Sequence, residues 1–334
     1  MPAFVDKLRH GASRWVRSFG RRPADDAADA FGLRAAEPSA DRPAAKPVPR
    51  GASRLGPGVE LGGYRLERLI GRGAVGAVYL AVDRVNDTPV ALKTLDLARE
   101  FEGIDFDAAR ERFLREAQAA SRLNHPDIVT VYGAGEERGL AYIAMEPLTG
   151  SDLSRYTRSA RLLPEPVVLR IVARVAEALA SAHAQGVLHR DIKPANVMVD
   201  LAAHQVKLTD FGIARLTDGE RTRTGLLIGT PSFMSPEQLA GSRLDGRSDL
   251  YSLGVMLFQL LTGRLPYDGH SMGELLRAIA SEEPLDLRAV RSDLPDSLAK
   301  IVATALKKPT TERFADGASF ASALGRAESE LLGR

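Results

Sequence analysis

The sequence predicts an α+β chain of two lobes, in which a small antiparallel β-sheet with one helix precedes a larger, mainly helical lobe. Between residues 64 and 145, short alternating or apolar runs such as AVYLAVD, PVALKTL and LAYIAME are typical of strands. After Gly150 the apolar residues recur at helical spacing. The chain has 334 residues, 44% of them hydrophobic, so it is long enough for two lobes with a real core. The first long helical face comprises Val168, Ile171, Val172, Val175, Leu179 and Ala182.

Residues 1–22 form a basic amphipathic segment. One interpretation is a helix that lies on a membrane surface or docks on a partner. The other is a frayed, partly ordered tail, which Gly11 in the middle of the segment favours. Both interpretations stay open, because helical spacing alone does not separate them. The apolar positions are Phe4, Val5, Leu8, Ala12, Trp15, Val16 and Phe19, and the basic ones are Lys7, Arg9, Arg14, Arg17, Arg21 and Arg22.

Residues 23–60 have the composition of a disordered linker, rich in Ala, Pro, Gly, Asp and Arg. Prolines at positions 38, 43, 47, 49 and 57 prevent any long helix or strand there. We therefore expect the folded part of the chain to begin at residue 61.

Composition excludes several kinds of site. The chain has no cysteine, which excludes disulfides, thiolate nucleophiles and cysteine zinc sites, and its 6 histidines lack metal-ligand spacing. The formal net charge of +2 is too small to argue for nucleic acid as a partner. No stretch approaches the ~20 apolar residues that a membrane-spanning helix needs, and the longest apolar run, at 250–261, predicts a helix buried in the protein. We expect a cytoplasmic protein.

The run GRGAVGAV at residues 71–78 is a candidate phosphate-binding loop. Gly71, Gly73 and Gly76 carry no side chain that would keep phosphate oxygens away from the backbone amides. The pattern alone is weak, because dinucleotide-binding folds and ordinary hairpin turns also carry it. A dinucleotide fold opens a helix at the third glycine, whereas AVYLAVD and PVALK predict two successive strands. The context therefore favours a strand, loop and strand flap over a nucleotide.

Lys93 lies between apolar residues of a predicted strand. A lysine on a buried strand face is costly unless anions meet it. In the following helix Phe113, Glu116, Ala120 and Leu123 are spaced three, four and three residues apart, which places Glu116 on the inward face. Glu116 is therefore the candidate partner of Lys93, preferred over a second carboxylate, Glu111, which lies off that face.

Two short motifs carry the chemistry of the chain: HRDIKPAN at residues 189–196 and LTDFG at 208–212. They supply Asp191, Lys193, Asn196 and Asp210. Transfer of a terminal phosphoryl group requires cations that neutralise its charge and a carboxylate that receives the hydroxyl proton. In this order and spacing the motifs resemble the catalytic loop and the magnesium loop of protein kinases.

The resemblance implies the bilobal protein kinase fold and a role for each of these residues. Asp191 would accept the proton of the substrate hydroxyl, and Lys193 would lie beside the transferring phosphoryl group. Asn196 and Asp210 would hold two Mg²⁺ ions, with Mn²⁺ as an alternative. ATP would be the phosphoryl donor.

The same resemblance implies an ATP site between the lobes. Lys93 would bind the α and β phosphates and pair with Glu116. Met145 would be the gatekeeper, and the backbone of Glu146 and Leu148 in the hinge would meet the purine edge. The adenine would lie between apolar side chains of Ile70, Val78, Ala91 and Met198.

The pair Lys193 and Pro194 is similar to the serine/threonine version of the catalytic loop. Thr230 in GTPSF supports this version, since in serine/threonine kinases a threonine here bridges the catalytic aspartate and lysine, positions that Asp191 and Lys193 match. The resemblance therefore implies protein substrates with Ser or Thr hydroxyls.

Structural residues of the large lobe follow from the same resemblance. Ser235, Pro236 and Glu237 stand where the family usually has Ala, Pro and Glu, and Glu237 would form a buried ion pair with Arg313. Asp249, at the start of the apolar helix, is expected to cap that helix and to hold the backbone of the catalytic loop.

Between the magnesium loop and Glu237 lies RLTDGERTRTGLLIGT, a polar segment that contains Thr222 and Thr224. Arg190 matches the arginine that grips a phosphate on this segment in many kinases. We expect autophosphorylation of Thr222 and Thr224 to order the loop and raise activity. The alternative is a plain basic loop.

The resemblance covers residues 61–325 and is strongest to bacterial eukaryotic-like serine/threonine kinases. It predicts a small lobe at 61–146, a hinge at 146–150, a large lobe at 151–325 and a tail at 326–334. A serine/threonine phosphatase and phosphothreonine-binding domains are the partners it implies.

A pseudokinase scaffold and a small-molecule phosphotransferase are the competing classes. A pseudokinase would lack one of Lys93, Asp191, Asn196 and Asp210, and none is missing here. A small-molecule phosphotransferase would lack the activation segment, the pair of Lys193 with Pro194, and the pair of Glu237 with Arg313. The substrates, the activating signal and the oligomeric state do not follow from the sequence.

Overall fold

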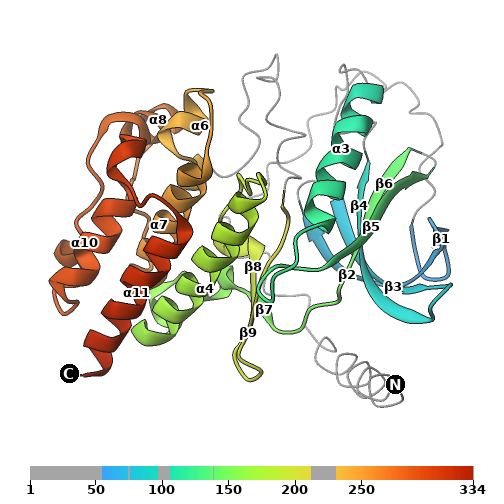
Figure 1. Ribbon diagram of the computed structural model, residues 1–334, viewed down its shortest axis with the longest axis horizontal. Helices are drawn as coiled ribbons and strands as arrows, with labels where there is room; N and C mark the ends of the chain where they lie inside the picture. The colour runs from blue at the N-terminus through green and yellow to red at the C-terminus, as the bar shows by residue number, and fades with distance from the viewer. Residues whose placement is uncertain (1–54, 74–75, 97–105, 138, 212–230, 334) are drawn as a thin grey trace, which may run out of the picture.

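The computed structural model describes residues 55–73, 76–96, 106–137, 139–211 and 231–333, which fold into two lobes (Figure 1). The smaller lobe is built on a sheet with helix α3 beside it, and the larger lobe is mainly helical. The chain passes between them through residues 146–150, directly after strand β6. The predicted α+β class and the two-lobed kinase arrangement are thereby confirmed.

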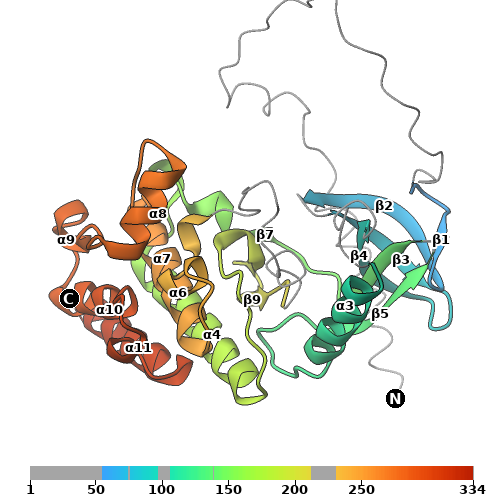
Figure 2. The same ribbon diagram turned by 90° about the horizontal axis from the view of Figure 1, so that it is seen from above.

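The small lobe is a six-stranded antiparallel sheet in the order β1-β2-β3-β4-β6-β5. Helix α3 (Phe106–Ser121) lies against this sheet (Figure 2). Its residues Phe113 and Ala117 pack with Ala91, Leu95 and Ile143 in one buried apolar cluster. The strands are β1 (Glu60–Leu61), β2 (Tyr64–Gly73), β3 (Gly76–Asp83), β4 (Thr88–Asp96), β5 (Val131–Glu137) and β6 (Leu140–Met145).

Residues 55–60, which were expected to belong to the linker, pack against the small-lobe sheet. Leu55 and Val59 pack against the buried cluster that contains Leu61 and Leu66. The Gly58 amide donates to the Leu66 carbonyl at 2.7 Å, and the Leu66 amide donates to the Val59 carbonyl at 2.8 Å. These apolar contacts and backbone hydrogen bonds hold residues 55–60 on the sheet, which average composition does not reveal. Residues 1–22 and 23–54 lie outside the described residues.

The large lobe combines a three-stranded sheet in the order β7-β8-β9 with a helical core. The strands are β7 (Ser151–Asp152), β8 (Val197–Asp200) and β9 (Gln205–Leu208). The α-helices are α4 (Glu165–Ala184), α6 (Pro236–Leu239), α7 (Gly246–Thr262), α8 (Met272–Ser281), α9 (Leu287–Val290), α10 (Asp296–Ala305) and α11 (Gly317–Leu332). Short 3₁₀ turns are η1 (Leu153–Tyr156), η2 (Ser159–Arg161), η3 (Pro194–Asn196), η4 (Pro231–Phe233) and η5 (Thr310–Glu312).

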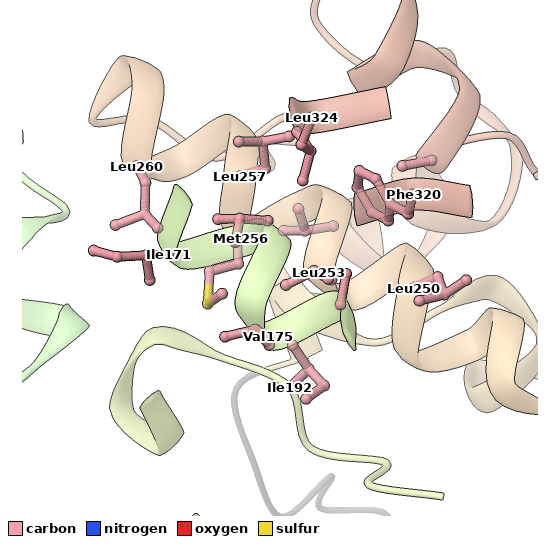
Figure 3. Close-up of a cluster of buried hydrophobic side chains, with 14 of the residues drawn as sticks. Ile171, Val175, Ile192, Leu250, Leu253, Met256, Leu257, Leu260, Phe320 and Leu324 are labelled. Atoms are coloured by element: carbon pink, nitrogen blue, oxygen red, sulfur yellow. The ribbon is translucent and has the colours of Figure 1, made fainter. Parts of the chain in front are cut away.

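Helices α4 and α7 form the centre of this lobe. Ile171 and Val175 of α4 lie next to Leu253 and Met256 of α7 (Figure 3). The six apolar positions predicted for the face of α4 are all buried, and the predicted buried helix at 250–261 is confirmed as part of α7. Gly254 permits the close approach of α10, because a Cβ there would lie 2.6 Å from the Cβ of Ala305. Within the described ranges, no helix has the length and hydropathy needed to cross a bilayer.

The predicted tail at 326–334 is helical for most of its length. Helix α11 continues to Leu332, with Ala327 buried and Leu331 packed on the core. Together with Phe320 and Leu324 these residues recur at helical spacing, which places them on the face that meets the rest of the lobe.

Candidate active site

The loop that contains Asp191 is anchored by a fully buried histidine. His189 Nε2 donates to the Thr209 carbonyl at 2.7 Å, while its Nδ1 accepts from the Asp191 amide at 3.2 Å. The imidazole therefore carries its proton on Nε2. Its ring also packs edge-on against Phe211, with centroids 4.7 Å apart. His189 thus ties the loop of Asp191 to the strand end that carries Asp210.

The structure brings three predicted residues together around the Asp191 carboxylate. Its Oδ2 accepts from Lys193 Nζ at 2.7 Å and from Asn196 Nδ2 at 2.9 Å. Asn196 Nδ2 also donates to the Asp191 carbonyl at 2.7 Å. Asn196 is buried, whereas the Asp191 side chain is 36% exposed. The carboxylate is therefore fixed from the protein side and accessible from outside.

Asp210 joins the two lobes. Its Oδ1 accepts from Lys93 Nζ of β4 at 2.7 Å. Burial alone would raise the pKa of the Asp210 carboxyl, but the charge and hydrogen bond of Lys93, with smaller effects of His189 and Lys193, hold this pKa below its usual range. Asp210 is therefore ionised at neutral pH, as its predicted role of metal ligand requires.

Lys93 contacts Asp210 rather than Glu116. Glu116 lies on α3, three residues after the buried Phe113 and four before the buried Ala120, which is the helical spacing of one face. Among the described side chains, however, the ammonium of Lys93 is bonded to the carboxylate of Asp210. The ion pair of Lys93 with Glu116 is not the arrangement of this structure, and it stays a prediction for the nucleotide-bound protein.

Most of the predicted adenine-site side chains lie in one apolar cluster of the small lobe. The sheet register places Gly71 opposite Val78 and Ala91 opposite Met145. Behind Met145 lies a cavity of about 20 Å³, also lined by Asp210 and Phe211. Met198 is in the large lobe, on β8, and is half-buried. The cluster contains Ile70, Val78, Ala91, Met145 and Leu148.

The hinge residue Glu146 is held by its side chain and by its amide. Its amide donates to the Thr130 carbonyl at 2.9 Å, and its carboxylate accepts from the Thr130 amide at 2.8 Å. Lys207 of β9 donates to the same carboxylate at 2.6 Å and to the Ile128 carbonyl at 3.2 Å. Since the Glu146 amide is used within the protein, its carbonyl is the backbone group that can meet a purine.

Sequence reasoning missed Lys207. The signal was available, because Lys207 stands between the apolar residues Val206 and Leu208 in a short predicted strand. A buried lysine on a strand requires an anion, and here Glu146 supplies it.

The glycine loop has the predicted strand, loop and strand form, and Gly73 pairs with Gly76 across it. Residues 74–75 between them are outside the described part. Gly76 needs to be a glycine for a reason inside the sheet, because a Cβ there would lie 2.0 Å from the Thr94 carbonyl oxygen of β4. At Gly71 a Cβ would make only an ordinary contact, with the Val78 Cβ 4.0 Å away.

Asp249 holds the catalytic loop, as predicted. Its carboxylate accepts from the amides of His189 and Arg190 at 2.9 and 2.7 Å and from His183 Nε2 at 2.8 Å. Burial would raise the pKa of Asp249, but the hydrogen bond and charge of His183, with His189, lower it overall.

The predicted capping role of Asp249 is wrong. Helix α7 begins one turn earlier, at Gly246, and its cap is Asp245, whose side chain accepts from the Arg247 amide.

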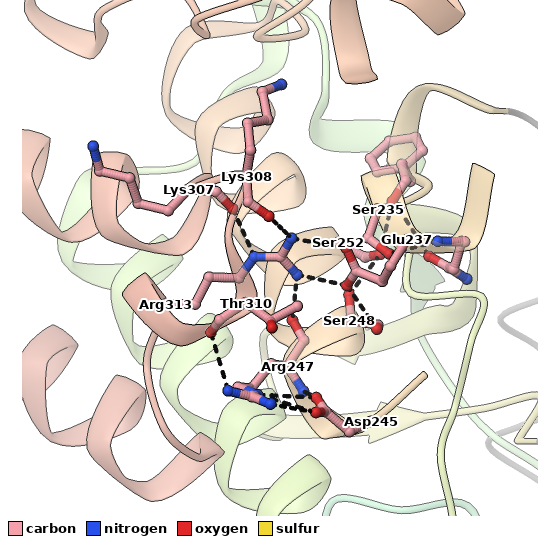
Figure 4. A network of polar contacts seen from close by, with 12 residues as sticks. Ser235, Glu237, Asp245, Arg247, Ser248, Ser252, Lys307, Lys308, Thr310 and Arg313 are labelled. Atoms are coloured by element: carbon pink, nitrogen blue, oxygen red, sulfur yellow. Dashed lines mark hydrogen bonds and ion pairs between the residues drawn. The ribbon is translucent and has the colours of Figure 1, made fainter. Parts of the chain in front are cut away.

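The predicted ion pair of Glu237 with Arg313 is present. Arg313 Nη1 and Nη2 donate to the two oxygens of Glu237 at 2.6 and 2.8 Å, and Ser248 Oγ donates to the same carboxylate at 2.7 Å (Figure 4). The Arg313 side chain has no exposed area, and its guanidinium lies over the ring of Tyr251. This pair fixes α6 to the segment that precedes α11.

Three predicted site residues, Thr222, Thr224 and Thr230, lie outside the described residues. Arg190 lies next to Asp191, and its backbone has φ +67°. Asp210 has the same φ value. Such left-handed conformations are uncommon for residues other than glycine, and they often mark functional sites.

Comparison with known proteins agrees with this geometry. Residues 64–323 match the protein kinase domain family. The chain is 40% identical over 278 residues to serine/threonine-protein kinase pkn3 of Myxococcus xanthus, covering 80% of this chain and 50% of that protein. It is 45% identical over 267 residues to serine/threonine-protein kinase PksC of Streptomyces coelicolor, covering 76% of this chain and 47% of that protein. The chain thus spans half the length or less of these relatives.

Among solved structures, the crystal structure of the PknI kinase domain of Mycobacterium tuberculosis is similar, with a TM-score of 0.67 and 35% sequence identity. The match covers 82% of this chain and 99% of that one. The fold, the family match and these relatives agree. The chain belongs to the protein kinase family and is similar to the bacterial serine/threonine kinases.

Proposed function

We propose that the protein is a serine/threonine protein kinase that transfers the γ-phosphoryl group of ATP to Ser or Thr hydroxyls of proteins. The observation that carries the proposal is the group formed by Asp191, Lys193 and Asn196, adjacent in the fold to the pair of Asp210 and Lys93. The family match over residues 64–323 and the names of the relatives support the same reaction class.

Asp191 is the proposed proton acceptor. Lys193 and Asn196 both bond to its Oδ2, which leaves Oδ1 for the hydroxyl of an incoming Ser or Thr. Lys193, whose side chain is 24% exposed, can reach the transferring phosphoryl group from this position. Lys93 would bind the α and β phosphates, and Thr230 would bridge Asp191 and Lys193.

Asn196 and Asp210 suit a hard divalent cation. Both offer oxygen ligands, and Mg²⁺ is usually held by one or two such groups together with phosphate oxygens. Asn196 turns Nδ2 toward Asp191, so its Oδ1 is the atom left for a cation. Bound Mg²⁺ would neutralise charge on the phosphates, and Mn²⁺ is the alternative ion.

Phosphates on Thr222 and Thr224 are the proposed activating groups, with Arg190 as their cationic partner. Phosphothreonine-binding domains and a serine/threonine phosphatase would read or remove them. Residues 1–22 are the segment proposed to contact a membrane surface or a partner of an otherwise cytoplasmic protein.

The experiment that tests the function is the intact mass of the purified protein before and after incubation with Mg·ATP, with Asp191→Asn as the matched control. Mass gains of whole phosphate units in the wild type alone, on mapped Ser or Thr residues, are expected. Equal gains in both proteins would refute the role of Asp191. No gain in either, with no transfer to a generic protein substrate, would refute the proposed activity.

A further inference from the structure

Gln238, a residue with no role assigned above, bonds to the backbone of the catalytic loop. It lies in the short helix α6, and its Nε2 donates to the carbonyl of Arg190 at 2.8 Å. Arg190 directly precedes Asp191 and has φ +67°. The side chain of Gln238 is partly buried between α6 and the loop.

The orientation of the Gln238 amide follows from its second contact. Its Oε1 accepts from the backbone N–H of Ser235 at 2.9 Å. This bond is half of a capping box, in which Ser235 Oγ accepts from the backbone N–H of Gln238. A flipped side chain would set its NH₂ group against the N–H of Ser235 and its oxygen against the carbonyl of Arg190. Only the observed orientation satisfies both ends, so Nε2 is the donor to Arg190.

The contact completes a clamp on one residue. The amide of Arg190 donates to Asp249 of α7, and the carbonyl of Arg190 accepts from Gln238 of α6. The two peptide planes on either side of the Arg190 Cα are thus held from two different helices, which fixes a left-handed conformation that an arginine does not favour.

The clamped peptide leads directly into Asp191. The plane that carries the Arg190 carbonyl also carries the Asp191 amide, which donates to His189 Nδ1. Both ends of this plane are therefore held, and its orientation sets the direction of the Asp191 side chain. We infer that Gln238 is a positioning residue for Asp191, one that transmits the placement of α6 to the proposed proton acceptor.

The inference rests on the proposed kinase activity and concerns the transfer step rather than nucleotide binding. Gln238 makes its contact with the backbone of the catalytic loop and not with the apolar cluster proposed for adenine. Small misplacements of a reacting group lower turnover, by up to about a hundredfold for 1 Å. Loss of the contact should thus lower kcat and leave KM for ATP nearly unchanged.

The variant that isolates the contact is Gln238→Glu. It is nearly isosteric, and a carboxylate oxygen can still accept from the Ser235 amide, but the donor to Arg190 is replaced by a second oxygen. The matched control is Ser235→Ala, which removes the Oγ of the capping box and leaves Nε2 of Gln238 in place.

The experiment uses the full 334-residue chain, with myelin basic protein as substrate and ATP varied. Q238E is expected to lower kcat about tenfold or more, with KM for ATP within about twofold of wild type, while S235A keeps kcat within about twofold. A second variant, Gln238→Met, should lower kcat to a similar extent. It shows whether a loss in Q238E comes from the missing donor or from misfolding of that one variant.

Wild-type kcat in both Q238E and Q238M would overturn the inference alone. Equal losses of kcat in Q238E and S235A, in parallel with their thermal unfolding midpoints, would also overturn it, because Gln238 would then act only as a helix cap. A wild-type chain without transfer activity would instead refute the proposed function itself.

Discussion

Glu237→Gln is a direct test of the buried ion pair in the large lobe. The five N–H groups of the Arg313 guanidinium all have acceptors: the two oxygens of Glu237 and the carbonyls of Arg247, Lys307 and Lys308. The glutamine keeps the shape of the side chain but removes the negative charge. The buried guanidinium of Arg313, which has no exposed area, therefore loses its counter-charge. In addition, the NH₂ group of the glutamine would face N–H donors of Arg313.

The expected loss follows from this burial. Removing one partner of a buried, hydrogen-bonded ion pair costs about 3–5 kcal/mol of the free energy of unfolding. For a domain of this size that corresponds to a fall in Tm of roughly 6–20 °C. The matched control is Glu60→Gln, which breaks the pair of Glu60 with Arg84. Their side chains are 52% and 56% exposed, and an exposed pair contributes about 0–1 kcal/mol.

The assay is urea denaturation of the wild type and the two variants at neutral pH, followed by circular dichroism. The midpoint of E237Q should fall well below those of the wild type and E60Q, with similar slopes. If E237Q lost no more than about 1 kcal/mol, or no more than E60Q, the buried pair would not stabilise the lobe as this reasoning requires.

The same pair predicts a pH dependence. Burial would raise the pKa of Glu237, but hydrogen bonds from Arg313 and Ser248 lower it overall, below its ordinary value. The stabilisation is therefore complete above the unfolded pKa of about 4.3 and is lost as the pH falls through the lower folded pKa. The difference in free energy of unfolding between the wild type and E237Q should stay constant from neutral pH to about pH 5 and shrink in more acidic buffer.

Three further predictions concern other residues. Asp249→Asn removes the charged acceptor of His183, His189 and Arg190. It should lower kcat by about tenfold and should also lower the urea midpoint. A wild-type kcat would contradict the positioning role of Asp249. Thr222→Ala combined with Thr224→Ala should lower specific activity after preincubation with Mg·ATP, and unchanged activity would leave only a plain basic loop. Burial lowers the pKa of Lys308 to about 8. Between about pH 8 and 10 Lys308 is therefore protonated in the unfolded chain but largely neutral in the folded one, so the free energy of unfolding of the wild type should rise with pH relative to that of Lys308→Met. Thermal melts across this range that showed no such relative rise would argue against the lowered pKa.

The HRDIKPAN motif was sufficient to predict that three polar side chains of the candidate site lie together. Asp191, Lys193 and Asn196 lie within six positions of one another, so the contacts among them follow from a single loop. The apolar face of α4 was predictable for the same reason, because helical spacing fixes which residues share a face.

Features that depend on distant parts of the chain were not predictable from spacing. Asp249 was expected to cap α7, but Asp245 caps this helix, and Asp249 accepts from the amides of His189 and Arg190, which are 60 and 59 positions away. Lys93 was expected at Glu116 and contacts Asp210, which is 117 positions away in sequence. The bond between Gln238 and Arg190 spans 48 positions. In each case the partner was decided by how the elements pack, which no local pattern records.

The two left-handed residues of the site are held in different ways, and this difference has a consequence. Conformations such as those of Arg190 and Asp210 cost about 1–3 kcal/mol each, so the surrounding contacts have to fix them. The contacts of Arg190 come from Asp249 and Gln238, both in the large lobe. The carboxylate of Asp210 is instead bonded to Lys93 in the small lobe. A rotation of the small lobe would therefore change the surroundings of the proposed metal ligand while it left those of the proposed proton acceptor intact.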